Sequence, residues 1–381
     1  MNLAAALLDD HPDADPALIS RGRTTTYGEL RGQVAAYRAG LVGLGLEPGD
    51  RVGILAGTNP YFVTTYLAVL GAGCVAVPIN PVSPPRAIER ELAEIGAAAV
   101  FVGPAGRSAF TGVDRGAVPT LRHVVAPGGP NPDGTVTEGA VPLGQLLATE
   151  PLPAVERADD ELAALIFTSG TAGSPKAAML THGNLRSNLE QVQAHPGRAL
   201  SRDDVVLGVL PLFHIFGLNV ALGGALFAGA SVLLVERFDP TSALESMANP
   251  RVTGVLGAPT MWSTWTSMPG VDRAAFASVR LAASGAAKLD PHVADAAAER
   301  LGVEITEGYG LTEASPVVTS SVGVGVKRGS IGVPLPGVQV RLVDVEGQDV
   351  LVGDPGELWV RGPNVFAGYW GDEAATAAAR T

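Results

Sequence analysis

One pattern occurs twice in the sequence and limits the fold more than any other feature. A helix-length apolar stretch ends at a glycine turn, and a short strand follows; the two copies span residues 61–79 and 218–235. Glycine commonly follows the end of a helix. Helix–strand units that repeat in this way are typical of parallel sheets covered by helices. The pattern predicts an α/β fold with two parallel-sheet subdomains packed together.

Short apolar segments elsewhere in the first half of the chain are expected to be further strands of these sheets. They are rich in Val, Ile and Leu, as buried parallel strands usually are. They lie at residues 51–55, 98–102, 121–125 and 162–167. Around the third of these segments, residues 104–153 are rich in Gly, Pro and Asp, which predicts mostly irregular surface.

The pattern changes toward the C-terminus. Apolar and polar residues alternate over 338–343 and 357–361, which predicts a small antiparallel, barrel-like β subdomain. Helix-forming sequence without a closing turn ends the chain, and we expect a cut end there. Three units are therefore predicted. They are a first α/β subdomain (1–165, with parts of the β subdomain), a second with the phosphate loop and acyl pocket (166–326), and the β subdomain (327–381).

Charge and composition narrow the range of partners. The chain has 38 acidic and 26 basic residues, a net charge of −12, and no basic cluster, so nucleic-acid binding is not expected. The single cysteine, Cys74, excludes an intrachain disulfide and fits a reducing, cytoplasmic location. Four glycines interrupt the uncharged stretch 215–235, so we expect no membrane span. The oligomeric state is left open, a homo-oligomer included.

The segment from Thr168 to Lys176 follows the expected strand at 162–167 and combines hydroxyl side chains with two glycines and one lysine. Glycines let backbone N–H groups approach phosphate oxygens, hydroxyls donate further hydrogen bonds, and lysine supplies positive charge. The spacing Gly-x-x-Gly-x-x-Lys differs from that of a Walker loop, which excludes a P-loop kinase. A phosphate-binding loop is predicted, with a Ser/Gly-rich surface loop as the alternative.

This loop and the residues after it resemble the signature of the adenylate-forming superfamily. That superfamily includes acyl-CoA synthetases, aryl-CoA ligases, luciferases and peptide-synthetase adenylation domains. Five motifs resemble it in the same order, at residues 168–185, 210–218, 284–287, 307–313 and 356–370. Ala172 and Ala177 depart from the usual Thr or Ser and Gly, but Thr171 and Lys176 are retained. The resemblance is to the large N-terminal domain of an acyl-CoA synthetase.

The resemblance implies an ATP site with Mg²⁺. Tyr309 would stack on the adenine, Thr312 would hydrogen-bond the α-phosphate, and Glu313 would bind Mg²⁺ together with Thr168. The candidate catalytic residues are Lys176, His214, Thr312 and Glu313. The expected nucleotide ligands are Thr168, Ser169, Gly170, Thr171, Gly173, Lys176, Ser284, Gly285, Ala286, Glu307, Gly308, Tyr309, Gly310 and Thr312.

The resemblance also implies an acyl pocket next to the nucleotide. Its expected residues are His214, Phe216, Gly217, Met261 and Gly285. A peptide-synthetase domain carries an aspartate just after the phenylalanine of this region, whereas His214 follows Phe213 here, so amino acids are disfavoured. We expect a fatty acid, with an aromatic acid such as a cinnamate or benzoate as the alternative. His182 also matches the superfamily, and we expect a structural role for it.

The implied reaction has two steps. A carboxylate attacks the α-phosphorus of ATP, pyrophosphate leaves, and the acyl-adenylate then reacts with a thiol, which we expect to be that of coenzyme A. The superfamily has a Thr-Gly-Asp block, a hinge and a C-terminal lysine that this sequence lacks, so we expect weak adenylation by this chain alone. A non-catalytic nucleotide- or acyl-binding domain is the alternative of another class.

Overall fold

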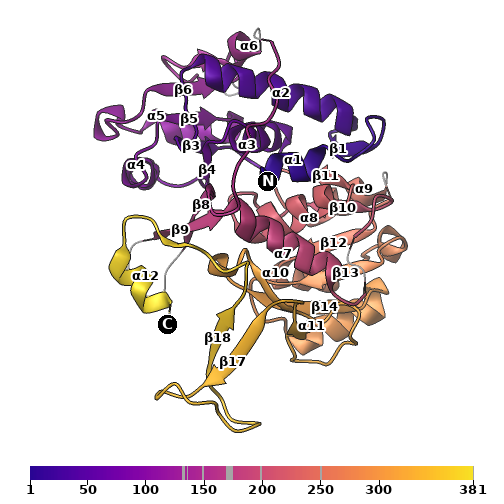
Figure 1. Cartoon of the computed structure of the whole chain (residues 1–381). Coiled ribbons are helices and arrows are strands. Elements are labelled where there is room, and N and C mark those ends of the chain that lie inside the picture. The colour runs from indigo at the N-terminus through magenta and orange to yellow at the C-terminus, as the bar shows by residue number, and fades with distance from the viewer. Residues whose placement is uncertain are drawn as a thin grey trace.

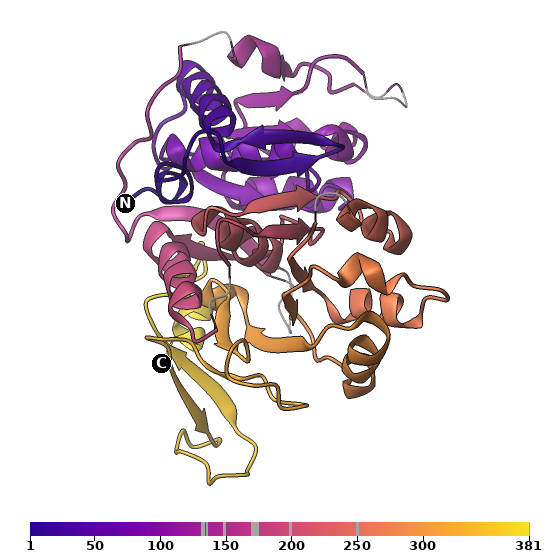
Figure 2. The same cartoon turned by 90° about the vertical axis from the view of Figure 1, so that its right-hand side faces the viewer.

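Two mixed sheets, each flanked by helices, lie one above the other, and a hairpin projects from the C-terminal part of the chain (Figure 1). Figure 2, turned by 90°, shows the same two layers from another side. The expected α/β fold with an additional small antiparallel sheet is confirmed. The computed structural model describes residues 1–130, 134, 136–147, 150–168, 175–197, 200–248 and 251–380.

The first sheet has eight strands in the order β19-β9-β8-β4-β3-β5-β6-β7. In this order, all neighbouring strands from β8 through β4, β3, β5 and β6 to β7 pair in parallel. Strand β9 is antiparallel to β8, and β19 is antiparallel to β9. The four strands expected from the sequence all belong to this sheet. Its members are β3 (Arg51–Leu55), β4 (Val75–Pro78), β5 (Ala99–Val102), β6 (His123–Ala126), β7 (Val141–Pro142), β8 (Leu162–Thr168), β9 (Lys176–Thr181) and β19 (Gly368–Tyr369).

The second sheet has nine strands in the order β16-β15-β14-β13-β12-β10-β11-β1-β2. Its centre is parallel, and an antiparallel strand pair lies at each end. The members are β1 (Pro16–Ser20), β2 (Arg23–Thr26), β10 (Val205–Gly208), β11 (Ser231–Leu234), β12 (Gly254–Gly257), β13 (Leu281–Ser284), β14 (Ile305–Gly310), β15 (Val317–Ser320) and β16 (Val333–Pro334).

The two sequence copies take similar positions but different helical forms. In the first copy, α3 (Pro60–Gly71) begins where the Asn59 side chain accepts from the backbone N–H of Phe62, and Gly73 turns the chain with φ +75°. In the second copy, Phe216–Gly223 is a π-helix, and only Gly224–Phe227 (α8) is α-helical. The expected helix before the glycine turn is therefore present, with its first part in the π form. No helix among the described residues is long and apolar enough to cross a membrane.

The region 104–153 is more regular than its composition suggests. It contains two short α-helices as well as β6 and β7, so the expectation of mostly irregular surface is wrong in part. The remaining α-helices are α1 (Leu3–Leu8), α2 (Tyr27–Gly43), α4 (Pro85–Glu94), α5 (Arg107–Thr111), α6 (Leu143–Leu146), α7 (His182–Ala194), α9 (Pro240–Ala248), α10 (Pro259–Ser267), α11 (Pro291–Ala296) and α12 (Glu373–Ala379).

The small antiparallel sheet consists of β17 (Gln339–Val343) and β18 (Glu357–Arg361), paired with Arg341 opposite Trp359. It is an open pair and not the expected barrel-like unit. Sheet membership also does not follow chain order, because β1 and β2 join the second sheet and β19 joins the first. The division of the chain at residues 165 and 326 stays a prediction.

One large apolar core extends from the first sheet into the second and includes Leu67 of α3, Leu185 of α7 and Leu226 of α8. Helix α1 contributes Leu3, and its position is fixed because the backbone N–H of Leu3 donates to Nδ1 of His182 over 3.0 Å. Burial, with the nearby positive charge of Arg157 next in size, lowers the pKa of His182 to about 4. The expected structural role of His182 is confirmed by this contact.

Asp204 anchors the edge at which β10, β12 and β13 begin. It is 3 % exposed; Thr253 Oγ1 and Arg280 Nε donate to its Oδ1 over 2.7 Å each, and the Ser201 backbone donates to its Oδ2. Burial alone would raise the pKa of this carboxyl, but hydrogen bonds from Arg280, Thr253 and Ser201 lower it from 3.8 to about 2.

We predict that Asp204→Asn lowers the free energy of unfolding by about 2 kcal/mol at neutral pH, because it removes charge-assisted hydrogen bonds. The unfolded carboxylate takes up a proton near pH 4 and the folded one only near pH 2, so the stabilisation is lost as the pH falls through this window. Urea unfolding at pH 7 and at low pH measures both effects. Asp203→Asn, at the exposed neighbouring position, is the control; equal stability of the two variants at pH 7 would contradict the prediction.

Candidate functional site

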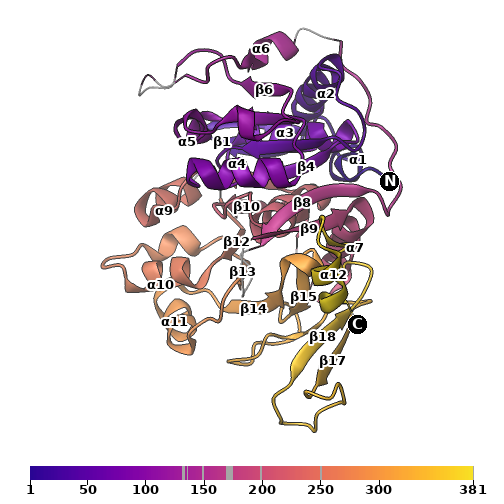
Figure 3. The ribbon, with the colours of Figure 1, turned by 90° about the vertical axis from the view of Figure 1, so that its left-hand side faces the viewer.

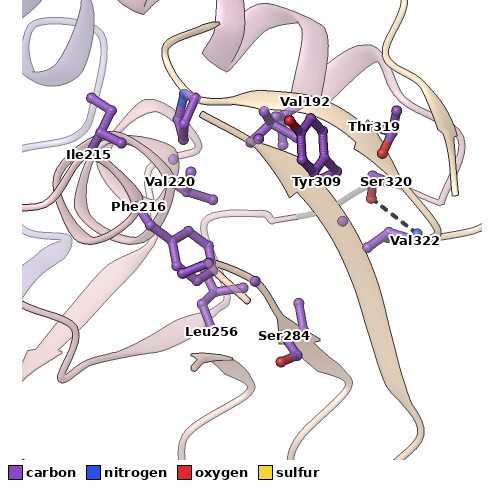
Figure 4. A pocket seen from close by; sticks show the side chains of 18 of the residues that line it. Val192, Ile215, Phe216, Val220, Leu256, Ser284, Tyr309, Thr319, Ser320 and Val322 are labelled. Atoms are coloured by element: carbon purple, nitrogen blue, oxygen red, sulfur yellow. Dashed lines mark hydrogen bonds between the residues drawn. The ribbon is translucent and has the colours of Figure 1, made fainter. Parts of the chain in front are cut away.

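A cavity of about 430 Å³ lies at the carboxyl ends of β12, β13 and β14. This is the edge at which open α/β sheets usually bind ligands. In Figure 4, Phe216, Val220 and Leu256 lie on one side of the pocket, and Tyr309 lies on the other with Thr319 and Ser320. The end of α7, the π-helix and the β14–β15 hairpin supply most of the wall.

The expected adenine-side residues gather on this cavity, although they come from two separate motifs. Ser284 ends β13, Gly285 and Ala286 follow it, and residues 307–310 end β14 beside them. Ser284 is 3 % exposed, and its hydroxyl has no hydrogen-bond partner in the part of the chain that the structure describes. Such a group is costly unless a ligand satisfies it, so the wall is suited to a molecule with polar edges.

The β14–β15 hairpin presents Tyr309 and Thr312 to the cavity. A β-bulge lies between Tyr309 and Gly310, and a short 3₁₀ turn over Thr312–Ala314 follows. The strands approach so closely here that a Cβ on Gly310 would collide with the carbonyl oxygen of Pro316. Tyr309 is left 39 % exposed. An exposed aromatic ring held by a tight hairpin can stack on a planar ligand.

Only the two ends of the predicted phosphate loop can be described. Thr168 ends β8 and Lys176 opens β9, and these residues are paired directly across the antiparallel ladder. Thr168 Oγ1 donates to the carbonyl oxygen of Lys176 over 3.4 Å. The remaining predicted ligands of this loop, which lie outside the described residues, are Ser169, Gly170, Thr171 and Gly173.

Lys176 and Glu313 do not line the cavity itself, but Tyr369 connects them. Its hydroxyl donates to Oε1 of Glu313 over 2.6 Å, and Nζ of Lys176 lies 5.2 Å from the centre of its ring. Lys176 also forms an ion pair with Asp372, with 3.7 Å between Nζ and Oδ2. Burial, the hydrogen bond to Glu313 and the nearby carboxylates raise the pKa of Tyr369. Tyr369 lies in the fifth of the motifs predicted from the sequence, at residues 356–370, but no role was predicted for Tyr369 or Asp372.

The expected acyl-pocket residues separate into two groups. His214, Phe216 and Gly217 line the cavity together with Gly285, where a Cβ would lie 3.1 Å from Cζ of Phe216. Met261, in contrast, is buried in α10 and is not among the lining residues. His214 lies at the exposed part of the wall, and desolvation by the surrounding protein lowers its pKa below 6.5. Its imidazole is therefore mainly neutral at pH 7.

The described residues contain no cluster of three or more His, Cys, Asp or Glu side chains that could hold a metal on its own. Glu313 offers one oxygen to Tyr369 and has a second for which no hydrogen bond is found among the described residues. Mg²⁺ is often held by one or two carboxylates together with substrate phosphates. A single carboxylate beside Thr312 fits that arrangement, and the roles of Glu313 and Thr168 as metal ligands stay predictions.

The family is decided by a match over almost the whole length of the chain. A family model described as "AMP-binding enzyme" matches residues 5–370. The chain belongs to this family. The family match and the names of the similar proteins indicate an AMP-forming acid–thiol ligase. The resemblance drawn from the five motifs is thereby confirmed.

Similar proteins act on different acids. The chain is 35 % identical to a feruloyl-CoA synthase from Amycolatopsis sp over 359 residues, covering 93 % of this chain and 68 % of that one. It is 33 % identical to a long-chain-fatty-acid–CoA ligase from Yersinia pestis over 394 residues, covering 95 % and 69 %. ATP-bound MatB from Rhodopseudomonas palustris superposes with a TM-score of 0.87 at 31 % identity, covering 99 % and 73 %.

We predict that Gly310→Ala in this AMP-binding enzyme lowers the free energy of unfolding by about 1–3 kcal/mol, because the added methyl group forces the β14–β15 backbones apart. Gly32→Ala is the matched control. It lies inside α2 with no atom within 4 Å of the added Cβ, and should be neutral or stabilising. Urea unfolding measures both. Equal stability of Gly310→Ala and the wild type would show that the hairpin is less tightly packed than described.

Proposed function

We propose that the chain uses ATP to convert a carboxylic acid to an acyl-adenylate, from which an acyl-CoA thioester is then formed. The observation that carries this proposal is the meeting of three motifs around one cavity. Ser284–Ala286 come from the motif at 284–287, Tyr309 and Thr312 from the motif at 307–313, and His214 and Phe216 from the motif at 210–218, and all of them line the cavity. His214 and Phe216 line the same cavity, which leaves room for an acid beside the nucleotide.

The chemistry of the first step requires positioning and charge neutralisation, with no protein nucleophile. We assign the neutralisation to Lys176, to the hydroxyl of Thr312, and to Mg²⁺ held by Glu313 with Thr168. When bound, Mg²⁺ would offset the negative charge of the phosphates. Lys176 is partly exposed, and among the described residues its ammonium group contacts Asp372 and the ring of Tyr369, so a phosphate can compete for it.

For the acid we propose a fatty acid. Aliphatic side chains form the wall opposite Tyr309, including Ile215, Val220 and Leu256. Such a wall suits an alkyl chain because it offers no hydrogen-bond partner for polar substituents. The likeness to a long-chain-fatty-acid–CoA ligase supports the same choice.

A second candidate, an aryl acid, is favoured by one local feature. The ring of Phe216 lies against Gly285, and only a residue without a side chain fits there without displacing it. This pair could form a flat slot for an aromatic ring, and the likeness to a feruloyl-CoA synthase agrees with it. In either case we propose coenzyme A as the thiol acceptor, with a carrier-protein thiol as the alternative.

The two acids are separated by binding of non-hydrolysable acyl-sulfamoyladenosine analogues, measured by calorimetry. The dodecanoyl analogue should bind at least 10-fold more tightly than the cinnamoyl analogue, because each buried methylene adds to the affinity. Phe216→Leu should weaken the cinnamoyl analogue more than the dodecanoyl one. Tighter binding of the cinnamoyl analogue by the wild type would favour the aryl acid, and binding of neither would contradict the proposed function.

We predict that Lys176→Ala and Glu313→Ala each lower acid-dependent pyrophosphate release by about 10²–10³-fold in kcat/KM, the usual cost of losing one charge-stabilising group. Lys327→Ala, at an exposed position outside the cavity, is the control and should keep the wild-type rate. Nucleotide binding without any acid-dependent pyrophosphate release in the wild type would support the non-catalytic alternative. Unchanged rates in both variants would contradict the assigned roles.

A further inference from the structure

Tyr369 contacts both charged residues that the proposed function places at the phosphates. Its hydroxyl donates to Oε1 of Glu313 over 2.6 Å. Its ring supports the ammonium group of Lys176, with 5.2 Å from Nζ to the ring centre. Lys176 opens β9, whereas Glu313 lies in the 3₁₀ turn after β14, so the two residues come from distant parts of the sequence. Tyr369 is a described side chain that contacts both of them.

The fold fixes Tyr369 from several directions. It belongs to β19, which is paired with β9 so that Tyr369 lies opposite Ala178, two residues after Lys176. Its backbone N–H donates to Oγ1 of Thr376 over 2.9 Å. Phe366 packs edge-on against its ring at 4.9 Å, and the backbone N–H of Phe366 donates to the carbonyl oxygen of Glu313 over 2.8 Å. The same short segment therefore holds the backbone of Glu313 and orients its side chain. Figure 3 shows this segment, with α12, beside β9 and α7.

The hydrogen bond from Tyr369 makes the two oxygens of the Glu313 carboxylate different. Oε1 accepts a hydrogen bond from the phenolic O–H of Tyr369, and Oε2 has no hydrogen bond among the described residues. A carboxylate held by one oxygen cannot rotate freely, so its other oxygen keeps one direction. Hydrogen-bond partners of this kind set the orientation of metal ligands, and their loss commonly weakens metal binding 10–100-fold.

We propose that Tyr369 is a positioning residue of the metal–phosphate site. Its hydroxyl aims Oε2 of Glu313 at the cation that accompanies the phosphates, while its ring keeps the ammonium group of Lys176 on the same side. The proposal rests on the proposed function, because it needs Glu313 to bind the metal. It assigns the hydroxyl to metal binding and the ring to nucleotide binding, so the two parts of one side chain can be tested separately.

The test is Tyr369→Phe, which removes the hydroxyl and keeps the ring, its packing on Phe366 and the pairing of β19. Binding of Mn²⁺ in the presence of a non-hydrolysable ATP analogue is measured by electron paramagnetic resonance. Metal-free binding of the same analogue is measured by calorimetry. We expect the dissociation constant for Mn²⁺ to rise about 10-fold. The metal-free affinity for the nucleotide should change less than about twofold, because the ring still supports Lys176.

Tyr61→Phe is the matched control, because it removes a buried tyrosine hydroxyl that has no hydrogen-bond partner among the described residues and lies outside the cavity. It should change neither constant. The variant Tyr369→Phe is also made in a Glu313→Gln background. A positioning role predicts that the hydroxyl deletion has no further effect on Mn²⁺ binding there, since the residue it acts through is already altered.

Four results decide between the outcomes. Weaker Mn²⁺ binding by Tyr369→Phe that disappears in the Glu313→Gln background supports it. An unchanged Mn²⁺ constant in Tyr369→Phe, with a wild type that binds the metal–nucleotide complex, overturns the positioning role and leaves the proposed function intact. A parallel loss of metal-free nucleotide affinity shows a general structural effect and overturns it as well. A wild type that binds no metal–nucleotide complex overturns the proposed function itself.

Discussion

The antiparallel ladder of β8, β9 and β19 is the constraint on which the site depends. Because Thr168 pairs with Lys176, both ends of the predicted phosphate loop have fixed positions. The outer side of β9 then pairs with β19, which brings Tyr369 and Asp372 to Lys176. Without this ladder, the lysine would be a flexible charge at the edge of a sheet.

The second sheet supplies the other half of the site through close backbone approach. Its parallel strands β12, β13 and β14 end at one edge, and the cavity lies there. A bulge lies between Tyr309 and Gly310 in the β14–β15 hairpin, and the tyrosine ring is partly exposed at the cavity. A ligand site at the carboxyl ends of parallel strands needs small residues where the backbone contacts the ligand, and rigid strands that hold those residues in place. Both are present at Ser284 and Gly285.

Local sequence patterns predicted the fold class and the strands β3, β4, β5, β6, β8, β11, β17 and β18, because these segments and the turns beside them are marked within a few residues. Of the second sheet they predicted β11 and missed the other described strands. They did not predict that β1 and β2 join the second sheet, since only tertiary packing brings β1 beside β11. The π-helix at Phe216–Gly223 has the same apolar composition as an α-helix and gives no separate signal. An apolar residue such as Met261 also looks the same in a sequence whether it lines a cavity or fills a core.

The site was predictable where motifs are local, as in residues 284–286 and 307–312, which the structure brings to one cavity. Tyr369 could not be assigned, because its partner Glu313 is 56 positions away and the contact arises from the pairing of β19 with β9.

The central claim is that ATP binds with its adenine between the residues after β13 and Tyr309. Photolabelling with 8-azido-ATP, followed by tryptic digestion and mass spectrometry, tests it most directly. We predict label on the peptides of residues 281–288 or 301–327, which contain Ser284–Ala286 and Tyr309, with loss of label in the presence of excess ATP. Label that excess ATP removes only from peptides outside these two would contradict the assignment of the cavity.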